Sequence, residues 1–410
     1  MAVLQDIQKK VEDGVRLDAQ DGLALFETPD LWTVGELAGL VRRRLHGDAA
    51  YYNVNRHLNY SNVCILSCKF CEFQRKPGQD GAYVFELEEI AEQARRAQQA
   101  GATEIHIVGG LHPKLKFDWY LEMLRSIRSA APLLHIKAFT AVELVHLARI
   151  SKRALRHDFA GGVASVLGDL LEAGLDSLPG GGAEVFDDRA HNEAWRGKIR
   201  SDQWLTVHRA AHRMGLFSNA TMLYGHVESR ANRIEHLLQL REEQDAAIRG
   251  GFPARFNTLI PLPFFPDGSA LEHLPGPTGL ENLRTLAVAR LMLDNFAHIK
   301  AFWIMQTLPM AQVMLDFGAD DVDGTVVWYD ITKVGGAGTH QEVSIQDMRR
   351  TILEAGYRPV ERDTLYRAVE REPGGGGWRV AGPLRPASDT AASAEASQAQ
   401  AEPVGAGAWD

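Results

Sequence analysis

The 410-residue sequence predicts an α/β protein organised as a (β/α)8 TIM-type barrel. Beyond Tyr60, short apolar runs alternate with helix-patterned stretches, and Gly, Pro or Asn residues separate them. Eight such runs with intervening helices fit a barrel of ordinary size. Polar clusters also follow several of the runs, where a barrel places its active site. An open doubly wound sheet is the alternative for the same alternation.

Residues 1–55 are expected to form an N-terminal helical extension. Leu4, Ile7, Val11 and Val15 follow a helical spacing. The first residues carry charges and have no apolar core of a signal peptide, so a cytoplasmic location is expected. No stretch of the chain approaches the roughly 20 apolar residues of a membrane span, so no membrane partner is expected.

The barrel itself is expected over residues 56–371. Its strands are short runs of apolar and β-branched residues bounded by turn residues. The expected strands are 59–64, 104–108, 134–139, 175–178, 217–223, 256–261, 298–304 and 325–329. The clearest helices, with apolar residues at helical spacing, are 86–100, 119–130, 201–214, 230–249 and 281–295.

The last segment, residues 372–410, is expected to be a disordered tail. It begins with a run of glycines and continues with Ala, Ser, Gln, Pro and Glu. Such a composition holds too few apolar residues to bury a core.

The charge balance excludes one class of partner. The 44 Lys and Arg residues and 53 Asp and Glu residues give a net charge of −9. Nucleic-acid binding depends on clustered Lys and Arg, so nucleic acid is not an expected partner.

The three cysteines of the chain all lie in one short loop, as Cys64, Cys68 and Cys71. Thiolates at this spacing can surround zinc or an iron–sulfur cluster. A closed zinc site needs a fourth ligand, such as His57 or His112. A [4Fe–4S] cluster held by three thiolates leaves one iron open for another molecule.

This loop, with Phe70 before the third cysteine, resembles that of radical S-adenosylmethionine (SAM) enzymes. The resemblance implies that Cys64, Cys68 and Cys71 hold the cluster as metal ligands and catalytic residues. SAM then chelates the open iron, and one electron from the cluster cleaves SAM to give a 5′-deoxyadenosyl radical. Phe70 is expected to pack over the cofactor. A one-electron donor such as flavodoxin or ferredoxin is the expected protein partner.

Longer strings refine the resemblance. Residues 55–64 are similar to the biotin synthase-like and deazaflavin synthase-like subgroup. The remaining strings together resemble the aminodeoxyfutalosine synthase family of menaquinone biosynthesis, over about residues 20–370; they are 106–113, 137–143, 178–184, 218–226, 298–300 and 320–325. This implies a transferase that adds the radical to 3-[(1-carboxyvinyl)oxy]benzoate. Rearrangement and loss of a carboxylate as bicarbonate then give 6-amino-6-deoxyfutalosine, and methionine is released.

The same resemblance suggests which residues contact SAM. Gly109 and Gly110 end the second expected strand, where glycine lets a ligand approach the backbone. Glu184 follows three glycines after the fourth expected strand and can accept hydrogen bonds from the ribose hydroxyls. The alternatives are a plain tight turn for the glycines and a solvated charge for Glu184.

A substrate with two carboxylates needs cations or strong donors. Lys137, His226 and Lys300 lie in strands or at strand ends and are expected to bind it, although each could instead form a structural ion pair. The expected orienting residues are Thr140, Glu143 and Asn219. Hydrogen bonding at a strand end or helix capping explains these three equally well.

Three alternatives remain at this point. The first two are radical SAM relatives that abstract hydrogen, similar to cyclic dehypoxanthine futalosine synthase or to deazaflavin synthase. The third is a non-catalytic metal-binding protein. Glu72, directly after the third cysteine, departs from the small residue usual in the family.

Overall fold

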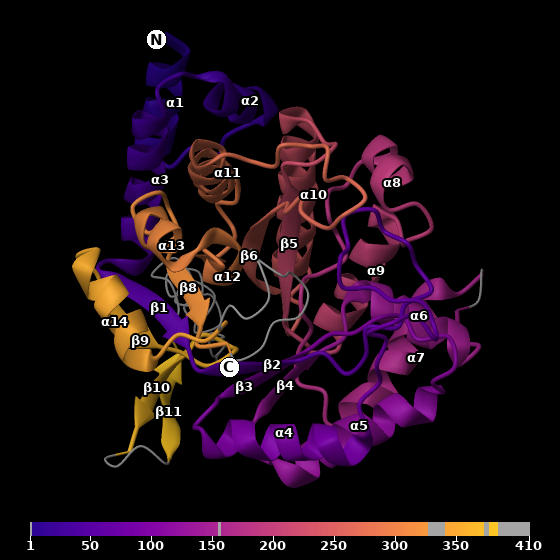
Figure 1. Cartoon of the computed structure of the whole chain (residues 1–410). Coiled ribbons are helices and arrows are strands. Elements are labelled where there is room, and N and C mark those ends of the chain that lie inside the picture. Colours follow the sequence, from indigo (N-terminus) through magenta and orange to yellow (C-terminus); the bar gives the residue numbers. More distant parts are fainter. Residues whose placement is uncertain (1, 155–156, 327–340, 373–376, 384–410) are drawn as a thin grey trace, which may run out of the picture.

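The computed structural model describes residues 2–154, 157–326, 341–372 and 377–383 (Figure 1). Most of the expected tail lies outside these residues. Its described part is ordered, which corrects the expectation there. Trp378–Pro383 forms β11, which pairs antiparallel with β10, Arg367–Arg371. Trp378 and Val380 are good strand formers, and Val380 faces Val369 across the ladder.

The N-terminal segment is helical up to His46. It consists of α1 (Ala2–Glu12), α2 (Ala19–Glu27) and α3 (Leu31–His46). Aspartates cap α2 and α3. The helical expectation is wrong for its last residues, because Ala49–Asn53 is strand β1, which pairs with two other strands. All five residues of β1 are buried, so no alternation of exposed and buried positions marked it as a strand.

The strands that follow are all parallel up to β9. Their bounds are β2 (Asn55–Leu58), β3 (Glu104–Ile107), β4 (His135–Ala138), β5 (Ser218–Tyr224), β6 (Phe256–Pro263), β7 (His298–Ile299), β8 (Asp321–Gly324) and β9 (Arg358–Glu361). They form three sheets with the orders β2–β3–β4, β5–β6–β7 and β8–β1–β9. Single bridges join neighbouring sheets: Lys137 to Ser177, Leu178 to Ser218, and Lys300 to Asp321.

Neighbouring strands therefore follow one another in chain order from β2 to β8. β8 then pairs with β1, and β1 continues directly into β2. This is the parallel α/β arrangement that the sequence predicted. No single closed eight-stranded sheet is defined among the described residues.

Three expected strands were misplaced. Residues 59–64 form a loop with isolated bridges, because β2 ends at Leu58. The strand expected over 298–304 is only two residues long, and Trp303–Gln306 is helix α12. The last strand lies at Asp321–Gly324 rather than 325–329, of which 327–329 fall outside the described residues. Segment 175–178 contributes bridges but no named strand.

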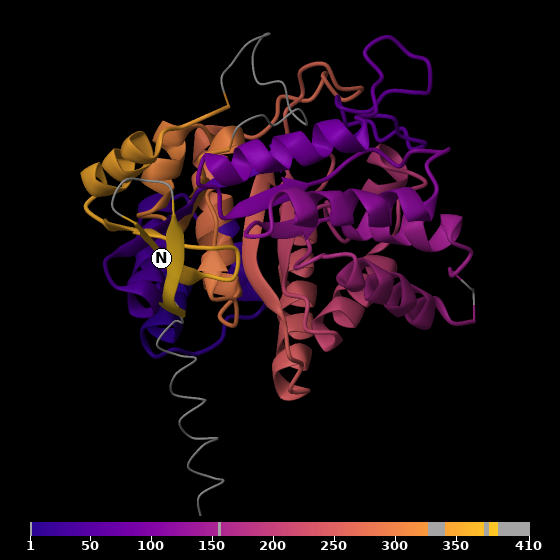
Figure 2. The same ribbon diagram turned by 90° about the horizontal axis from the view of Figure 1, so that it is seen from below.

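Helices surround the strands (Figures 1 and 2). Their bounds are α4 (Leu87–Gln99), α5 (Phe117–Ala130), α6 (Ala141–Ile150), α7 (Phe159–Glu172), α8 (Asp188–Ala194), α9 (Ser201–Arg213), α10 (Arg230–Arg249), α11 (Gly279–Met292), α13 (Leu308–Met314) and α14 (Ile345–Glu354). In Figure 1, α4 and α5 cover the outer side of β2, β3 and β4. Among the described residues, no helix combines the length and apolar character needed to cross a membrane.

Candidate active site

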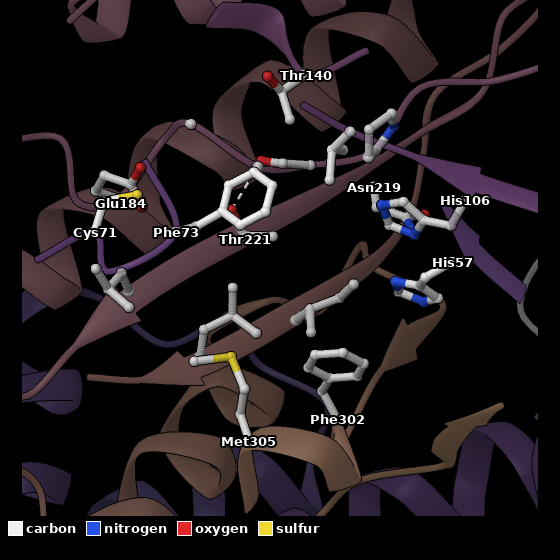
Figure 3. Close-up of a pocket in the computed structure, with 18 of the residues that line it drawn as sticks. His57, Cys71, Phe73, His106, Thr140, Glu184, Asn219, Thr221, Phe302 and Met305 are labelled. Carbon is white, nitrogen blue, oxygen red and sulfur yellow. Dashed lines mark hydrogen bonds between the residues drawn. The ribbon is translucent and has the colours of Figure 1, made fainter. Parts of the chain in front are cut away.

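A cavity of about 280 Å³ lies among the ends of the parallel strands and the loops after them (Figure 3). Figure 3 shows Cys71 and Glu184 at one end of it and His57 and His106 at the other. Apolar side chains also line the cavity, including Leu223, Ile260, Phe302 and Met305. Of the residues expected to act, the lining includes Phe70, Cys71, Gly109, Lys137, Thr140, Glu143, Glu184, Asn219 and Lys300.

The cysteine loop follows β2 and is fixed through its backbone. The Cys64 N–H donates to the Arg75 carbonyl over 2.9 Å, and the Cys71 N–H donates to the Cys68 carbonyl over 3.1 Å. All three thiols are free and half-buried, and together they line a second cavity of about 140 Å³ beside the first. The loop thus gathers three soft donors around one space.

The donor set fits a cluster held by three thiolates better than a closed zinc site. Burial raises the pKa of the Cys68 thiol to about 12, so its thiolate needs a nearby cationic centre, which a bound metal of either kind would supply. His57 lies at the far end of the cavity from Cys71 (Figure 3). His112 does not line the cavity formed by the three thiols, and its Nδ1 accepts hydrogen bonds from the N–H groups of Lys114 and Leu115. Neither histidine is thus placed as a fourth ligand.

The glycines after β3 lie where a side chain has no room. A Cβ at Gly109 would come within 2.4 Å of the Tyr60 ring, and one at Gly110 within 2.4 Å of the Val63 carbonyl oxygen. The Gly110 N–H donates to the Ser61 carbonyl over 2.7 Å. The two glycines therefore let the strand end pack directly against the cysteine loop.

Thr140 and Glu143 form the N-terminal capping box of α6. The Glu143 carboxylate accepts hydrogen bonds from the Tyr60 hydroxyl and the Gly109 N–H, each over 2.9 Å, and from the Thr140 N–H over 2.8 Å. The capping interpretation of both residues is therefore correct. Through Gly109, the same carboxylate also fixes the backbone of the site.

Glu184 is held at the cysteine end by a partner that sequence analysis missed. Its carboxylate pairs with the Lys198 ammonium, and its φ of +49° is unusual for a residue other than glycine. Lys198 also lies 5.2 Å from the centre of the Phe70 ring. Burial opposes the charge of Lys198, but Glu184 and the Cys68 thiolate outweigh it and raise the pKa of Lys198. No periodic pattern in the loop marked Lys198.

Both lysines expected to bind the substrate are already in ion pairs. The Lys137 Nζ lies 2.6 Å from the Glu104 Oε1, and the Lys300 Nζ lies 2.5 Å from the Asp323 Oδ1. Burial is the main cause that lowers the pKa of Lys137. The structural ion-pair interpretation is thus correct for both, yet both also line the cavity.

His226 does not line the cavity. Its side chain is buried, its Nδ1 lies 3.0 Å from the Glu228 Oε2, and its Nε2 lies 3.0 Å from the Leu223 carbonyl oxygen. These contacts give it a structural place in the loop after β5. Asn219 is on β5 itself and does line the cavity.

Two histidines line the cavity: His57, which the sequence suggested only as a possible zinc ligand, and His106, which it did not suggest as a site residue. The rings of His57 and His106 stack with centroids 4.5 Å apart and an interplanar angle of 22°. A signal was present, since His106 is a polar residue between Ile105 and Ile107 in an expected strand.

Comparisons with known proteins agree with this arrangement. Residues 58–240 match the model of the radical SAM superfamily, and residues 253–373 match the CofH/MqnC C-terminal region. Among solved structures, methylornithine synthase (PylB) has a TM-score of 0.65 at 18% identity, covering 86% of this chain and 97% of its own. The hydrogenase maturase HydG has a TM-score of 0.64 at 14% identity, over 88% of this chain and 76% of its own. These two likenesses show the fold alone.

Curated relatives are much more similar in sequence. The aminodeoxyfutalosine synthase of Thermus thermophilus is 43% identical over 88% of this chain and 95% of its own length. That of Streptomyces coelicolor is 41% identical over 90% of this chain and 95% of its own. A 5-amino-6-(D-ribitylamino)uracil–L-tyrosine 4-hydroxyphenyl transferase of Methanosphaerula palustris is 36% identical over 88% of this chain and 97% of its own length.

Proposed function

The chain belongs to the radical SAM superfamily and carries the CofH/MqnC C-terminal region, and from this premise we propose that it is an aminodeoxyfutalosine synthase. As a member of the superfamily, the protein is an enzyme that uses a [4Fe–4S] cluster and SAM. The proposed reaction joins the 5′-deoxyadenosyl group of SAM to 3-[(1-carboxyvinyl)oxy]benzoate. The observation that carries this proposal is the 43% identity to a synthase of that name over nearly the full length of both chains.

The cavity supports the proposal by its two unlike ends. Cys64, Cys68 and Cys71 would hold the cluster by their thiolates. When bound, the cluster and SAM supply the 5′-deoxyadenosyl radical. Gly109 and Gly110 line the cavity beside the three thiols, and their lack of a Cβ lets the strand end pack directly against the cysteine loop. This end of the cavity would therefore hold SAM.

Glu184 and Lys198 would orient SAM from the opposite side of this end. A carboxylate accepts hydrogen bonds from ribose hydroxyls, and the ion pair with the Lys198 ammonium would hold the Glu184 carboxylate in place for that role. Phe70 would pack over the bound cofactor. In this arrangement Lys198 would position the Glu184 carboxylate and would take no part in the reaction itself.

The remaining cavity suits an aromatic carboxylate. Apolar side chains such as Leu223, Ile260 and Phe302 line its middle and would exclude water from the reacting vinyl carbon. Polar side chains from several strands line its far part, with Lys137 and Lys300 paired to Glu104 and Asp323. Asn219 also lines the cavity and would orient the substrate.

Product identification tests the proposal. Anaerobically reconstituted enzyme is given SAM, a chemical reductant and 3-[(1-carboxyvinyl)oxy]benzoate, and the products are separated and weighed by mass spectrometry. The expected products are 6-amino-6-deoxyfutalosine and methionine. Formation of 5′-deoxyadenosine and methionine without any adduct would overturn the proposal.

A second function is favoured by the transferase similarity. At 36% identity, the 4-hydroxyphenyl transferase relative covers as much of this chain as the first synthase does. The same enzyme preparation should therefore also be given 5-amino-6-(D-ribitylamino)uracil and L-tyrosine. Release of 5′-deoxyadenosine with a joined product would identify this transferase instead.

A further inference from the structure

Three nitrogen-bearing side chains form a row across neighbouring strands. His57 of β2 is in register with His106 of β3, and His106 is in register with Lys137 of β4. All three line the cavity, and Figure 3 shows the two histidines at the end opposite Cys71 and Glu184. This row is called the histidine end below.

Both imidazoles are neutral in the ligand-free protein. Burial lowers the pKa of His57 to about 4 and holds the pKa of His106 well below its ordinary value. Burial disfavours the charged ring, and two rings 4.5 Å apart repel each other if both are protonated. The stacked pair can therefore accept one proton more readily than two.

The charges that face this pair cancel within the described part of the chain. From β3 and β4 come Glu104 and Lys137, 2.6 Å apart. Lys300 follows β7 and pairs with Asp323 of β8, while Asp321 of β8 lies 2.6 Å from Arg362, which follows β9. Three cations thus match three anions. A carboxylate that enters would add an unmatched negative charge in a buried place, which is costly.

We propose that His57 and His106 form an anion subsite, which binds one carboxylate of the substrate together with one proton. This inference rests on the proposed function, whose substrate carries two carboxylates. Solvent supplies the proton, one N–H bond forms on one imidazole, and the resulting imidazolium faces the carboxylate. The total charge of the histidine end then returns to zero, and the aromatic ring occupies the apolar middle of the cavity.

The subsite also gives a basis for selectivity. A ligand with an amide in place of the carboxylate brings no charge to the histidine end and requires no proton. Its binding should therefore be independent of pH in the neutral range, whereas that of the carboxylate weakens as pH rises. The loss approaches tenfold per pH unit, or about 1.4 kcal/mol, as long as pH lies above the pKa of the free histidine pair and below that of the bound imidazolium.

Calorimetry on the intact holoenzyme tests the inference. The enzyme is reconstituted anaerobically and saturated with SAM, and reductant is left out so that no turnover occurs. Isophthalate and 3-[(1-carboxyvinyl)oxy]benzoate are each titrated at about pH 7 in two buffers of different ionisation enthalpy, which counts the protons bound. Wild-type enzyme should take up about one proton with either ligand.

Two variants and a control test whether the proton binds to His57 or His106. His57→Asn and His106→Asn should each reduce proton uptake to well under half and weaken binding at least about tenfold. His157→Asn changes an exposed histidine away from the cavity and should alter neither quantity. Equal SAM binding by all variants shows that each one is folded.

The outcomes separate this inference from the proposed function. Wild-type binding without proton uptake, or no binding of either ligand, overturns the subsite even if the enzyme forms the expected product. Unchanged uptake in both histidine variants also overturns it, because the carboxylate then binds as the neutral acid. Proton-linked binding of isophthalate by an enzyme that forms no adduct supports the subsite and overturns the function. If a variant does not fold, the wild-type proton count still decides.

Discussion

Lys137 places a buried charge where a strand would ordinarily carry an apolar side chain. Its ammonium and the Glu104 carboxylate are both almost fully shielded from solvent, and Thr364 donates a hydrogen bond to the second carboxylate oxygen over 2.7 Å. Burial opposes the ionisation of Glu104, but Lys137 together with Lys300 and Arg362 holds the pKa of that carboxyl well below its ordinary value. The two charges therefore depend on each other.

Removal of one partner should cost more than removal of both. Lys137→Met leaves the Glu104 carboxylate buried without its cation, so the free energy of unfolding should fall by about 3 kcal/mol. The double variant Lys137→Met with Glu104→Gln should recover part of this loss. Thermal unfolding of the three proteins measures the effect, and equal losses in the single and double variants would contradict it.

Gly110 should be sensitive to the smallest possible side chain. The Cβ of Gly110→Ala would meet the backbone carbonyl oxygen of Val63 at 2.4 Å, so the entry to the cysteine loop must shift. A displacement of this kind in a binding site should weaken the affinity for SAM by about tenfold or more. Equilibrium binding of SAM to the reconstituted enzyme measures it.

Gly168→Ala is the matched control for this substitution. Gly168 lies in α7, and its nearest neighbour to a new Cβ is a methionine methyl at 4.0 Å. Alanine also favours helix, so this variant should bind SAM normally and be at least as stable. Normal SAM binding by Gly110→Ala would show that the close approach is not needed.

Elements with a clear period were predictable, and elements buried on all sides were not. Helix α4, with a clear period, differs from prediction by one residue at each end, and α9 differs by one residue at one end; α10 also has the predicted bounds, although its period is weak. Helix α6 was missed because its residues are buried up to Ala148, so no polar face marks it. β1 was missed for the same reason, whereas β3 and β4 stood out between turn residues.

The candidate site was predictable where function depends on spacing along the chain. Three cysteines within one loop indicate a cluster site on their own. Lys198 approaches Glu184 only because α8 and the loop after it fold back, and no sequence pattern predicts that contact. His226 was misjudged for the converse reason, since its partner Glu228 is local and keeps it away from the cavity.

The turn between β5 and α10 should make stability depend on pH. Glu228 accepts hydrogen bonds from the Gly225 N–H over 2.6 Å and from the Arg233 Nε over 2.8 Å. Although burial opposes ionisation, His226 and Arg233 hold the pKa of Glu228 below its ordinary value of 4.5. A lowered pKa stabilises the folded state above about pH 4.5, and this contribution is lost as pH falls through the folded-state pKa.

Glu228→Gln should therefore destabilise the protein by about 2 kcal/mol at neutral pH and by progressively less in acid. Thermal unfolding midpoints measured from neutral to acidic pH test this. The control is Glu235→Gln on the exposed face of α10, which should follow the wild type throughout. A gap between Glu228→Gln and wild type that stays constant with pH would contradict the assignment.

At the scale of the whole molecule, the C-terminal region contributes to the cluster end of the cavity. Residues 264–277, called the strap here, follow β6 and lie against the cysteine loop. The Ala270 N–H donates to the Lys69 carbonyl, and the Lys69 N–H donates to the Ala194 carbonyl, each over 2.8 Å. Glu72 lies against Gly268 of the strap. The two regions matched by family models therefore build one site.

The strap is held by a small hydrophobic cluster that is separate from the main core. Leu271 is buried there with Trp195 and Phe264, and Cys68 and Phe70 pack against the cluster. This packing connects the strap directly to two residues of the cysteine loop. Truncation of Leu271 should therefore loosen the loop without disturbing the strands.

Leu271→Ala should bind SAM and iron normally when freshly reconstituted but lose its cluster faster. A buried Leu→Ala change costs about 2–5 kcal/mol, and here that cost falls on the contact between strap and loop. Loss of the visible absorbance of the cluster in air should be at least about fivefold faster than in wild type, because local opening becomes more frequent. Leu280→Ala, at an exposed position of α11, is the control and should match the wild-type rate. Equal rates in all three proteins would show that the strap does not protect the cluster, and that the C-terminal region serves the substrate end of the cavity alone.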